Sequence, residues 1–141
     1  MRVVGLIPVR MESTRLPGKA LKDVLGLPAI VHVYKRCALA KSLDDLYVVT
    51  DSEEIKQQVE EHGGRVLISG KHKNGSERIH EVSKDLECSH IINIQGDEVL
   101  VDPKHIDKIV SEFSKRPEIK YVVGVTPYSE VELKQDFKAV L

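Results

Sequence analysis

The sequence has 141 residues, the length of one ordinary domain. Hydrophobic residues make up 41% of it and charged residues 30%, which is typical of a soluble globular protein. Its 21 basic and 22 acidic side chains give a net charge of −1. This balance argues against nucleic-acid binding, which needs a basic excess or a basic face. An aromatic content of 4% argues against a base-stacking surface as well.

The cysteines and the N-terminal segment predict a cytoplasmic protein. Cys37 and Cys88 form neither a CxxC pair nor a metal-binding spacing, so we expect two buried free thiols in a reducing compartment. The apolar run that begins at Val3 meets Pro8 after five residues. It is too short for a signal peptide or a membrane span. We therefore expect no targeting segment and no membrane partner.

Apolar runs alternate with helical patterns along the chain. The apolar runs are continuous, as expected for strands that are buried on both faces of a sheet. The intervening segments repeat apolar residues at helical spacing. In chain order, the sequence predicts strand 3–9, helix 28–40, strand 46–50, helix 52–62, strand 65–69, helix 76–86, strand 90–95, helix 103–113 and strand 121–126, with a further strand at 137–141.

Helix boundaries follow from residues that cap or end helices. Ser52 and Ser76 are N-cap candidates for the second and third helices, and Gly63 would end the second. Asp102 is the cap candidate of the fourth helix, with Pro103 in its first turn.

This β-α-β-α-β-α-β-α-β order predicts one α/β domain over residues 1–141. We expect a three-layer α/β/α sandwich with a mostly parallel sheet. Ligands of such sheets bind at the carboxyl ends of the strands. The main polar motifs of this sequence follow strands, so they are expected to meet at that edge.

The first motif is the basic segment IPVRMESTRLPGK, which follows the first strand. Arg10, Arg15 and Lys19 would give a triphosphate its cations, and Ser13 and Thr14 would add hydroxyl donors. The segment has neither the GxxxxGK[ST] spacing of a P-loop nor GxGxxG. A solvated basic loop would have the same charges, so this alternative stays open.

The second motif is NIQGDE, which follows the strand at 90–95. Asp97 is placed to hold a hard cation such as Mg²⁺, which takes one or two protein carboxylates and phosphate oxygens. Gly96 would let the backbone approach a ligand closely. An ordinary strand-end turn would also contain Gly and Asp.

The third motif is HKNGSER, which precedes the third helix. Free N–H groups at a helix start favour an anion or a carbonyl. The alternative is a capped loop in which Ser76 caps the helix and Arg78 is solvated.

Asp51 is interpreted as a cap next to Ser52. No HExxH pair and no GxSxG elbow occurs, so zinc-protease and serine-hydrolase chemistry have no support.

R-x-x-S-T-R-L-P-G-K, after a strand that ends in I-P-x-R, resembles the signature of sugar nucleotidyltransferases. It is most similar to 3-deoxy-manno-octulosonate (Kdo) cytidylyltransferases. N-I-Q-G-D-E is similar to that family's V-N-V-Q-G-D-E-P, V-V-T-D to its V-A-T-D, and H-K-N-G-S-E-R to its H-x-S-G-T-D-R. The resemblance runs from about Val4 to the end of the chain. Val99, Asn74 and Glu77 depart from the family's usual Pro, Ser and Asp.

The resemblance implies a nucleotide-diphospho-sugar transferase-like (Rossmann-like) fold, and it assigns roles to residues. Arg10, Lys19 and Asp97 would be catalytic, and Asp97 would bind Mg²⁺. The residues expected to bind the nucleotide are Pro8, Arg10, Ser13, Arg15, Lys19, Gly75, Ser76, Arg78 and Gln95.

By the same resemblance, the protein would be a nucleotidyltransferase that transfers CMP from CTP to the anomeric hydroxyl of Kdo. The products would be CMP-Kdo, a lipopolysaccharide precursor, and pyrophosphate. Family members are longer, so we expect a fragment that lacks the C-terminal part for sugar binding and dimerisation. The complete protein is expected to be a homodimer. Two alternatives stay open: a sugar nucleotidyltransferase with a different sugar or base, and a non-catalytic CTP-binding module.

Overall fold

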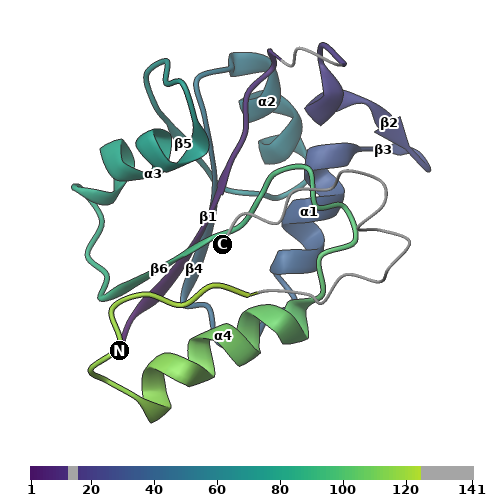
Figure 1. Ribbon diagram of the computed structural model, residues 1–141. Helices are drawn as coiled ribbons and strands as arrows, with labels where there is room; N and C mark the ends of the chain where they lie inside the picture. Colours follow the sequence, from purple (N-terminus) through teal and green to yellow (C-terminus); the bar gives the residue numbers. More distant parts are fainter. Residues whose placement is uncertain (13–15, 125–141) are drawn as a thin grey trace, which may run out of the picture.

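A four-stranded parallel sheet forms the centre of the described part of the chain (Figure 1). The computed structural model describes residues 1–12 and 16–124. The strand order is β5-β4-β1-β6, so β1 has a hydrogen-bonded neighbour on each side. These strands are β1 (Val3–Pro8), β4 (Asp45–Thr50), β5 (Val66–Ile68) and β6 (His90–Asn93).

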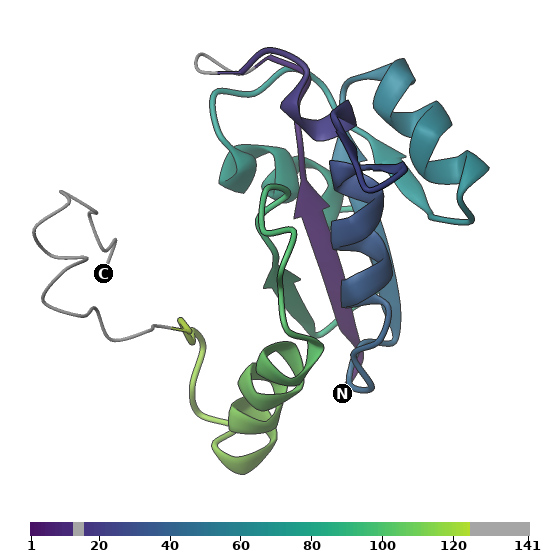
Figure 2. The ribbon, with the colours of Figure 1, turned by 90° about the vertical axis from the view of Figure 1, so that its right-hand side faces the viewer.

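Helices cover both faces of this sheet (Figure 2). Successive residues of β1 point to opposite faces. Val3 and Ile7 belong to the core that contains α1, α2 and α4, whereas Val4 and Leu6 pack with α3. The predicted α/β/α sandwich with a parallel sheet is therefore confirmed. The helices are α1 (Ala29–Cys37), α2 (Glu53–Glu61), α3 (Gly75–Ser83) and α4 (Pro103–Lys115).

The predicted boundaries of α2 and the predicted start of α4 are confirmed, although α4 continues two residues beyond the predicted end at Phe113. The Ser52 hydroxyl accepts the N–H of Ile55 at 3.3 Å, and α2 ends just before Gly63, whose φ is +81°. Asp102 caps α4 with its carboxylate, and Pro103 is the first helical residue.

The predicted cap of α3 is wrong by two residues. Asn74 is the N-cap, because its side-chain oxygen accepts the N–H of Glu77 at 2.9 Å. The helix therefore begins at Gly75, and Ser76 lies in its first turn. Asparagine and serine cap helices about equally well, so composition alone did not decide between the two positions.

The segment between β1 and α1 contains a short 3₁₀ helix, η1 (Lys19–Leu21), and a small hairpin, β2 (Asp23–Val24) with β3 (Leu27–Pro28). The hairpin turn places Leu25 and Gly26 at φ values of +50° and +88°. Such short strands carry no periodic signal, so they could not be predicted from the sequence pattern.

The predicted strand 121–126 is wrong for the residues that the structure describes. Residues 121–124 have no strand conformation, and Tyr121 and Val123 are 81% and 47% exposed. An apolar run becomes a strand only when a neighbour takes up its hydrogen bonds, and no described residue does so. Residues 125–126 and the predicted strand at 137–141 lie outside the described residues.

The two cysteines are unpaired but differ in burial. Cys37 is buried against the sheet, and this burial raises the pKa of its thiol to about 12. Cys88 is only half-buried, so the expectation of two buried thiols is right for Cys37 alone. Within residues 1–12 and 16–124, no helix is long and apolar enough to cross a membrane.

Asp107 anchors α4 to the loop between α1 and β4. One of its oxygens accepts the N–H groups of Lys41 and Ser42, each at 2.9 Å, and the Ser42 hydroxyl at 2.6 Å. Burial raises the pKa of Asp107, but these hydrogen bonds outweigh it and leave the pKa below its ordinary value.

Replacement of Asp107 by Ala should lower the free energy of unfolding by about 1–2 kcal/mol, because two N–H groups and a hydroxyl lose their acceptor. Urea unfolding at pH 7 measures this loss. Because the pKa of Asp107 is lower in the folded protein than in the unfolded chain, Asp107 stabilises the fold fully above the unfolded-state pKa of about 4. This stabilisation is lost as the pH falls through the folded-state pKa. Asp107→Asn keeps an acceptor oxygen and should lose less. Equal losses in the two variants at pH 7 would contradict the proposed anchor.

Candidate active site

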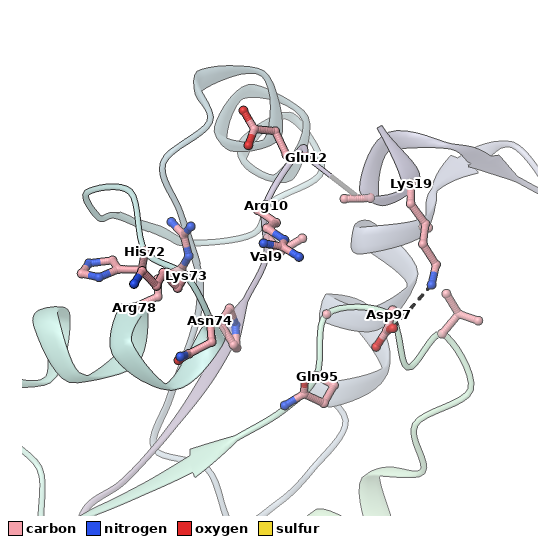
Figure 3. A pocket seen from close by; sticks show the side chains of 16 residues that line it. Val9, Arg10, Glu12, Lys19, His72, Lys73, Asn74, Arg78, Gln95 and Asp97 are labelled. Atoms are coloured by element: carbon pink, nitrogen blue, oxygen red, sulfur yellow. Dashed lines mark hydrogen bonds and ion pairs between the residues drawn. The ribbon is translucent and has the colours of Figure 1, made fainter. Parts of the chain in front are cut away.

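A cavity of about 400 Å³ lies at the carboxyl end of β1, between the loops that precede α3 and follow β6 (Figure 3). Residues of η1 and of the segment that follows β1 complete its walls. This is the edge of the sheet at which the motifs were expected to meet. The predicted site residues that line it are Pro8, Arg10, Lys19, Gly75, Arg78, Gln95 and Asp97. Ser13 and Arg15 lie outside the described residues.

Two glycines allow the neighbouring loops to reach the end of β1. A Cβ atom on Gly75 would lie 2.9 Å from the Pro8 ring. A Cβ atom on Gly96 would lie 2.9 Å from the Pro8 carbonyl oxygen and 3.1 Å from Val9 Cβ. The close approach expected for Gly96 is thus an approach to β1 itself. It brings Gln95 and Asp97 to the cavity.

Gly96→Ala should destabilise the chain by about 1–3 kcal/mol, because the new methyl group meets a backbone carbonyl that cannot move without shifting β1. Thermal unfolding measures this effect. Gly26→Ala is the control that replaces a glycine without a steric clash, since nothing lies within 4 Å of a Cβ atom there. Because Gly26 has a φ of +88°, this control includes the cost of placing alanine in a left-handed conformation. A Gly96→Ala variant as stable as the wild type would show that the loop can retreat freely.

The basic segment is closed by a hydrogen bond from the Gly18 N–H to the Met11 carbonyl, 3.0 Å long. Gly18 adopts a φ of +70°, which a glycine tolerates best. This turn starts η1 and directs Lys19 toward the loop after β6. There, Lys19 Nζ lies 3.4 Å from Asp97 Oδ2, and both side chains are more than half exposed (Figure 3). Arg10 is exposed and has no ion pair with any described residue.

Arg78 lines the cavity, but its guanidinium group is held by the protein. The residue is only 4% exposed. Its Nη1 donates to the Ser69 hydroxyl at 2.6 Å and to the Gly70 carbonyl at 3.2 Å, and it lies 3.3 Å from Asp51 Oδ1. The alternative of a solvated Arg78 is therefore wrong. So is the interpretation of Asp51 as a helix cap: Ser52 caps α2, while Asp51 compensates the buried cation.

Ser76 does not line this cavity. It is exposed and borders a shallower hollow on α3, together with His80, Glu81 and Lys84. Successive helical residues are rotated by about 100°, so Ser76 points away when Gly75 packs on the end of β1.

Sequence reasoning did not assign site roles to three neighbouring residues that line the cavity, His72, Lys73 and Asn74. They belong to the HKNGSER motif, so their position just before α3 was the available signal. Glu12 was missed as well. With Arg10 and Lys19, Lys73 makes the cavity suitable for an anion.

No group of three or more His, Cys, Asp or Glu side chains within residues 1–12 and 16–124 could hold a metal ion. Asp97 is an exposed carboxylate beside the cavity, which Glu12 also lines. A site of this kind suits an ion that receives its other ligands from phosphate oxygens and water.

The sequence matches the cytidylyltransferase family over residues 4–141. The chain belongs to this family. The 3-deoxy-manno-octulosonate cytidylyltransferase of Geobacter sulfurreducens is 40% identical to it over 121 residues, which are 85% of this chain and 48% of that protein. The 8-amino-3,8-dideoxy-manno-octulosonate cytidylyltransferase of Shewanella amazonensis is 45% identical over 121 residues, 83% of this chain and 49% of that protein. This cytidylyltransferase chain thus spans about half the length of the curated relatives it matches.

Solved structures agree with this membership. A CMP:2-keto-3-deoxy-manno-octonic acid synthetase in complex with CTP has a TM-score of 0.81 and 34% identity, covering 83% of this chain and 49% of that one. The resemblance to Kdo cytidylyltransferases, expected from the motifs, is confirmed. A manganese complex of Rv0371C from Mycobacterium tuberculosis has a TM-score of 0.60 at 12% identity, covering 79% of this chain and 59% of that one, and shares the fold.

Proposed function

We propose that this chain is the nucleotide-binding half of a Kdo cytidylyltransferase. The enzyme would transfer CMP from CTP to the anomeric hydroxyl of Kdo and release pyrophosphate. The observation that carries this proposal is the convergence of Arg10, Lys19 and Asp97 at the carboxyl edge of the sheet, in a chain of the cytidylyltransferase family. The activities named for the relatives from Geobacter and Shewanella support it.

The cationic side chains would hold the triphosphate. Arg10 offers a planar fork for two phosphate oxygens, and Lys19 offers a compact charge. The start of α3 adds backbone donors. The Asn74 side chain accepts the N–H of Glu77, which leaves the N–H groups of Gly75 and Ser76 available to a phosphate. A departing pyrophosphate would gain negative charge beside the same groups, which lowers the barrier.

Asp97 would hold Mg²⁺ between the protein and the phosphates. The position suits a cation, because the Lys19 ammonium group already lies beside this carboxylate. When bound, the ion would neutralise phosphate charge and make the attacking hydroxyl more acidic. Gln95 has an exposed amide that would orient ribose or sugar hydroxyls. Such positioning supplies most of the catalysis in phosphoryl chemistry.

Binding and turnover of CTP test the proposal. Calorimetry with the 141-residue chain should detect CTP in the presence of Mg²⁺. Arg10→Ala should weaken that binding by about tenfold or more, because a charged hydrogen-bond donor to phosphate is lost. Exposed Lys22 is the matched control, and Lys22→Ala should bind as the wild type does. Absence of CTP binding by the wild-type chain would contradict the proposal.

Pyrophosphate release then separates an enzyme from a binding module. Release from CTP that depends on Kdo would support catalysis by this half alone. The 8-amino analogue of Kdo is the second substrate to test, because relatives with that named activity are about as similar. If the chain binds CTP but releases no pyrophosphate with either sugar, it is a non-catalytic binding module or needs the second half of the enzyme for catalysis.

Loss of the Lys19–Asp97 ion pair should have opposite effects on the affinity for metal and the affinity for nucleotide. Lys19→Met should tighten Mn²⁺ binding to the nucleotide-free chain by about two- to fivefold, because an exposed ion pair of this kind is worth up to about 1 kcal/mol. The same change should weaken CTP binding. Electron paramagnetic resonance of free Mn²⁺ measures the first effect, and Asp97→Asn should abolish the binding. Unchanged Mn²⁺ affinity in Lys19→Met would exclude competition at Asp97.

The remaining parts of the proposal concern the compartment, the role of the product and the oligomeric state. The unpaired cysteines suit the reducing cytoplasm, which we propose as the compartment. Synthesis of a lipopolysaccharide precursor and a homodimer of the complete protein belong to the same proposal.

A further inference from the structure

Gly70 lies at the start of the loop that leads to α3. Side chains of that helix bond both its backbone N–H and its backbone carbonyl. Its N–H donates to the two carboxylate oxygens of Glu81, at 2.9 and 3.2 Å. Its carbonyl accepts from Arg78 Nη1 at 3.2 Å. Arg78 and Glu81 lie three residues apart and therefore on the same side of α3. The loop is thus fixed to the helix at a point where loops are usually mobile.

Glu81 also holds the next part of the same loop. Its carboxylate pairs with the imidazole of His72, whose side chain is 23% exposed. The hydrogen bond from His72, and then that from the Gly70 N–H, lowers the pKa of Glu81, so the carboxylate is charged at neutral pH. The end of the loop is fixed as well, because Glu77 accepts the N–H of Lys73 at 3.3 Å.

The residues fixed in this way form one wall of the cavity. His72, Lys73 and Asn74 line it, whereas Glu81 does not (Figure 3). Glu81 is 45% exposed and borders the outer hollow of α3. Its contacts with Gly70 and His72 can therefore act on a ligand only through the loop.

We propose that Glu81 is a positioning residue for nucleotide binding, which together with Arg78 holds loop 70–74 in the conformation that receives CTP. This inference rests on the proposed function. A loop that is correctly placed only part of the time lowers the apparent affinity by that fraction. Glu81 is the better residue to test, because Arg78 is buried and its loss would leave Asp51 unpaired.

Glu81→Ala should raise the dissociation constant for CTP by about tenfold, if the loop is then correctly placed about one tenth of the time. The melting temperature should stay nearly unchanged, since Glu81 is exposed and alanine favours helices. Amide hydrogen exchange, followed by NMR, should become faster at Gly70 and Lys73, whose N–H groups are hydrogen-bonded to side chains of α3. Glu81→Gln keeps an acceptor for Gly70 and should restore most of the affinity and protection. Glu87→Ala, which removes an exposed carboxylate beyond α3, is the charge-matched control.

Unchanged CTP affinity in Glu81→Ala would overturn the inference. Equal loss in Glu81→Gln and Glu81→Ala would also overturn it, because charge and not hydrogen bonding would then be responsible. If the wild-type chain binds no CTP, the proposed function fails, but hydrogen exchange still decides the role of Glu81. Faster exchange in Glu81→Ala would support its hold on the loop, and unchanged exchange would refute it.

Discussion

Strand β1 hydrogen-bonds to β4 on one side and to β6 on the other, and its carboxyl end fixes where the neighbouring loops can meet. Every residue from Val3 to Pro8 is buried, so the strand cannot shift without exposing apolar surface on both faces. Gly75, at the start of α3, and Gly96, in the loop after β6, both pack closely against Pro8. The cavity is the space left at this junction, and its shape depends on backbone packing before any ligand arrives.

The cationic side chains that line the cavity differ in how far they are buried. Arg78 is almost completely removed from water, so its guanidinium group must be paired and hydrogen-bonded within the protein. Ser69, Gly70 and Asp51 meet this requirement, which ties the ends of β4 and β5 to α3. Arg10 and Lys19 remain exposed and are free to change partners. The site thus separates cations that hold the structure from cations that can bind an anion.

Much of the fold was predictable because its signals are local. The apolar runs gave the four described strands of the parallel sheet, and Ser52, Asp102 and Pro103 gave helix starts through the bonding of nearby N–H groups. The small hairpin at 23–28 was missed because two-residue strands have no period. The run at 121–124 was misassigned because an apolar pattern does not specify a hydrogen-bonding partner.

The sequence by itself determined which residues carry charge, which runs are apolar and in what order the motifs follow the strands. These properties sufficed for the fold class and for the family. Tertiary structure alone decided that Ser76 faces away from the cavity, that Asp51 pairs with Arg78, and that Glu81 holds the loop before α3. Each of these depends on helix rotation or on contacts between distant segments. Such contacts arise from packing in three dimensions, and no local pattern of residues encodes them.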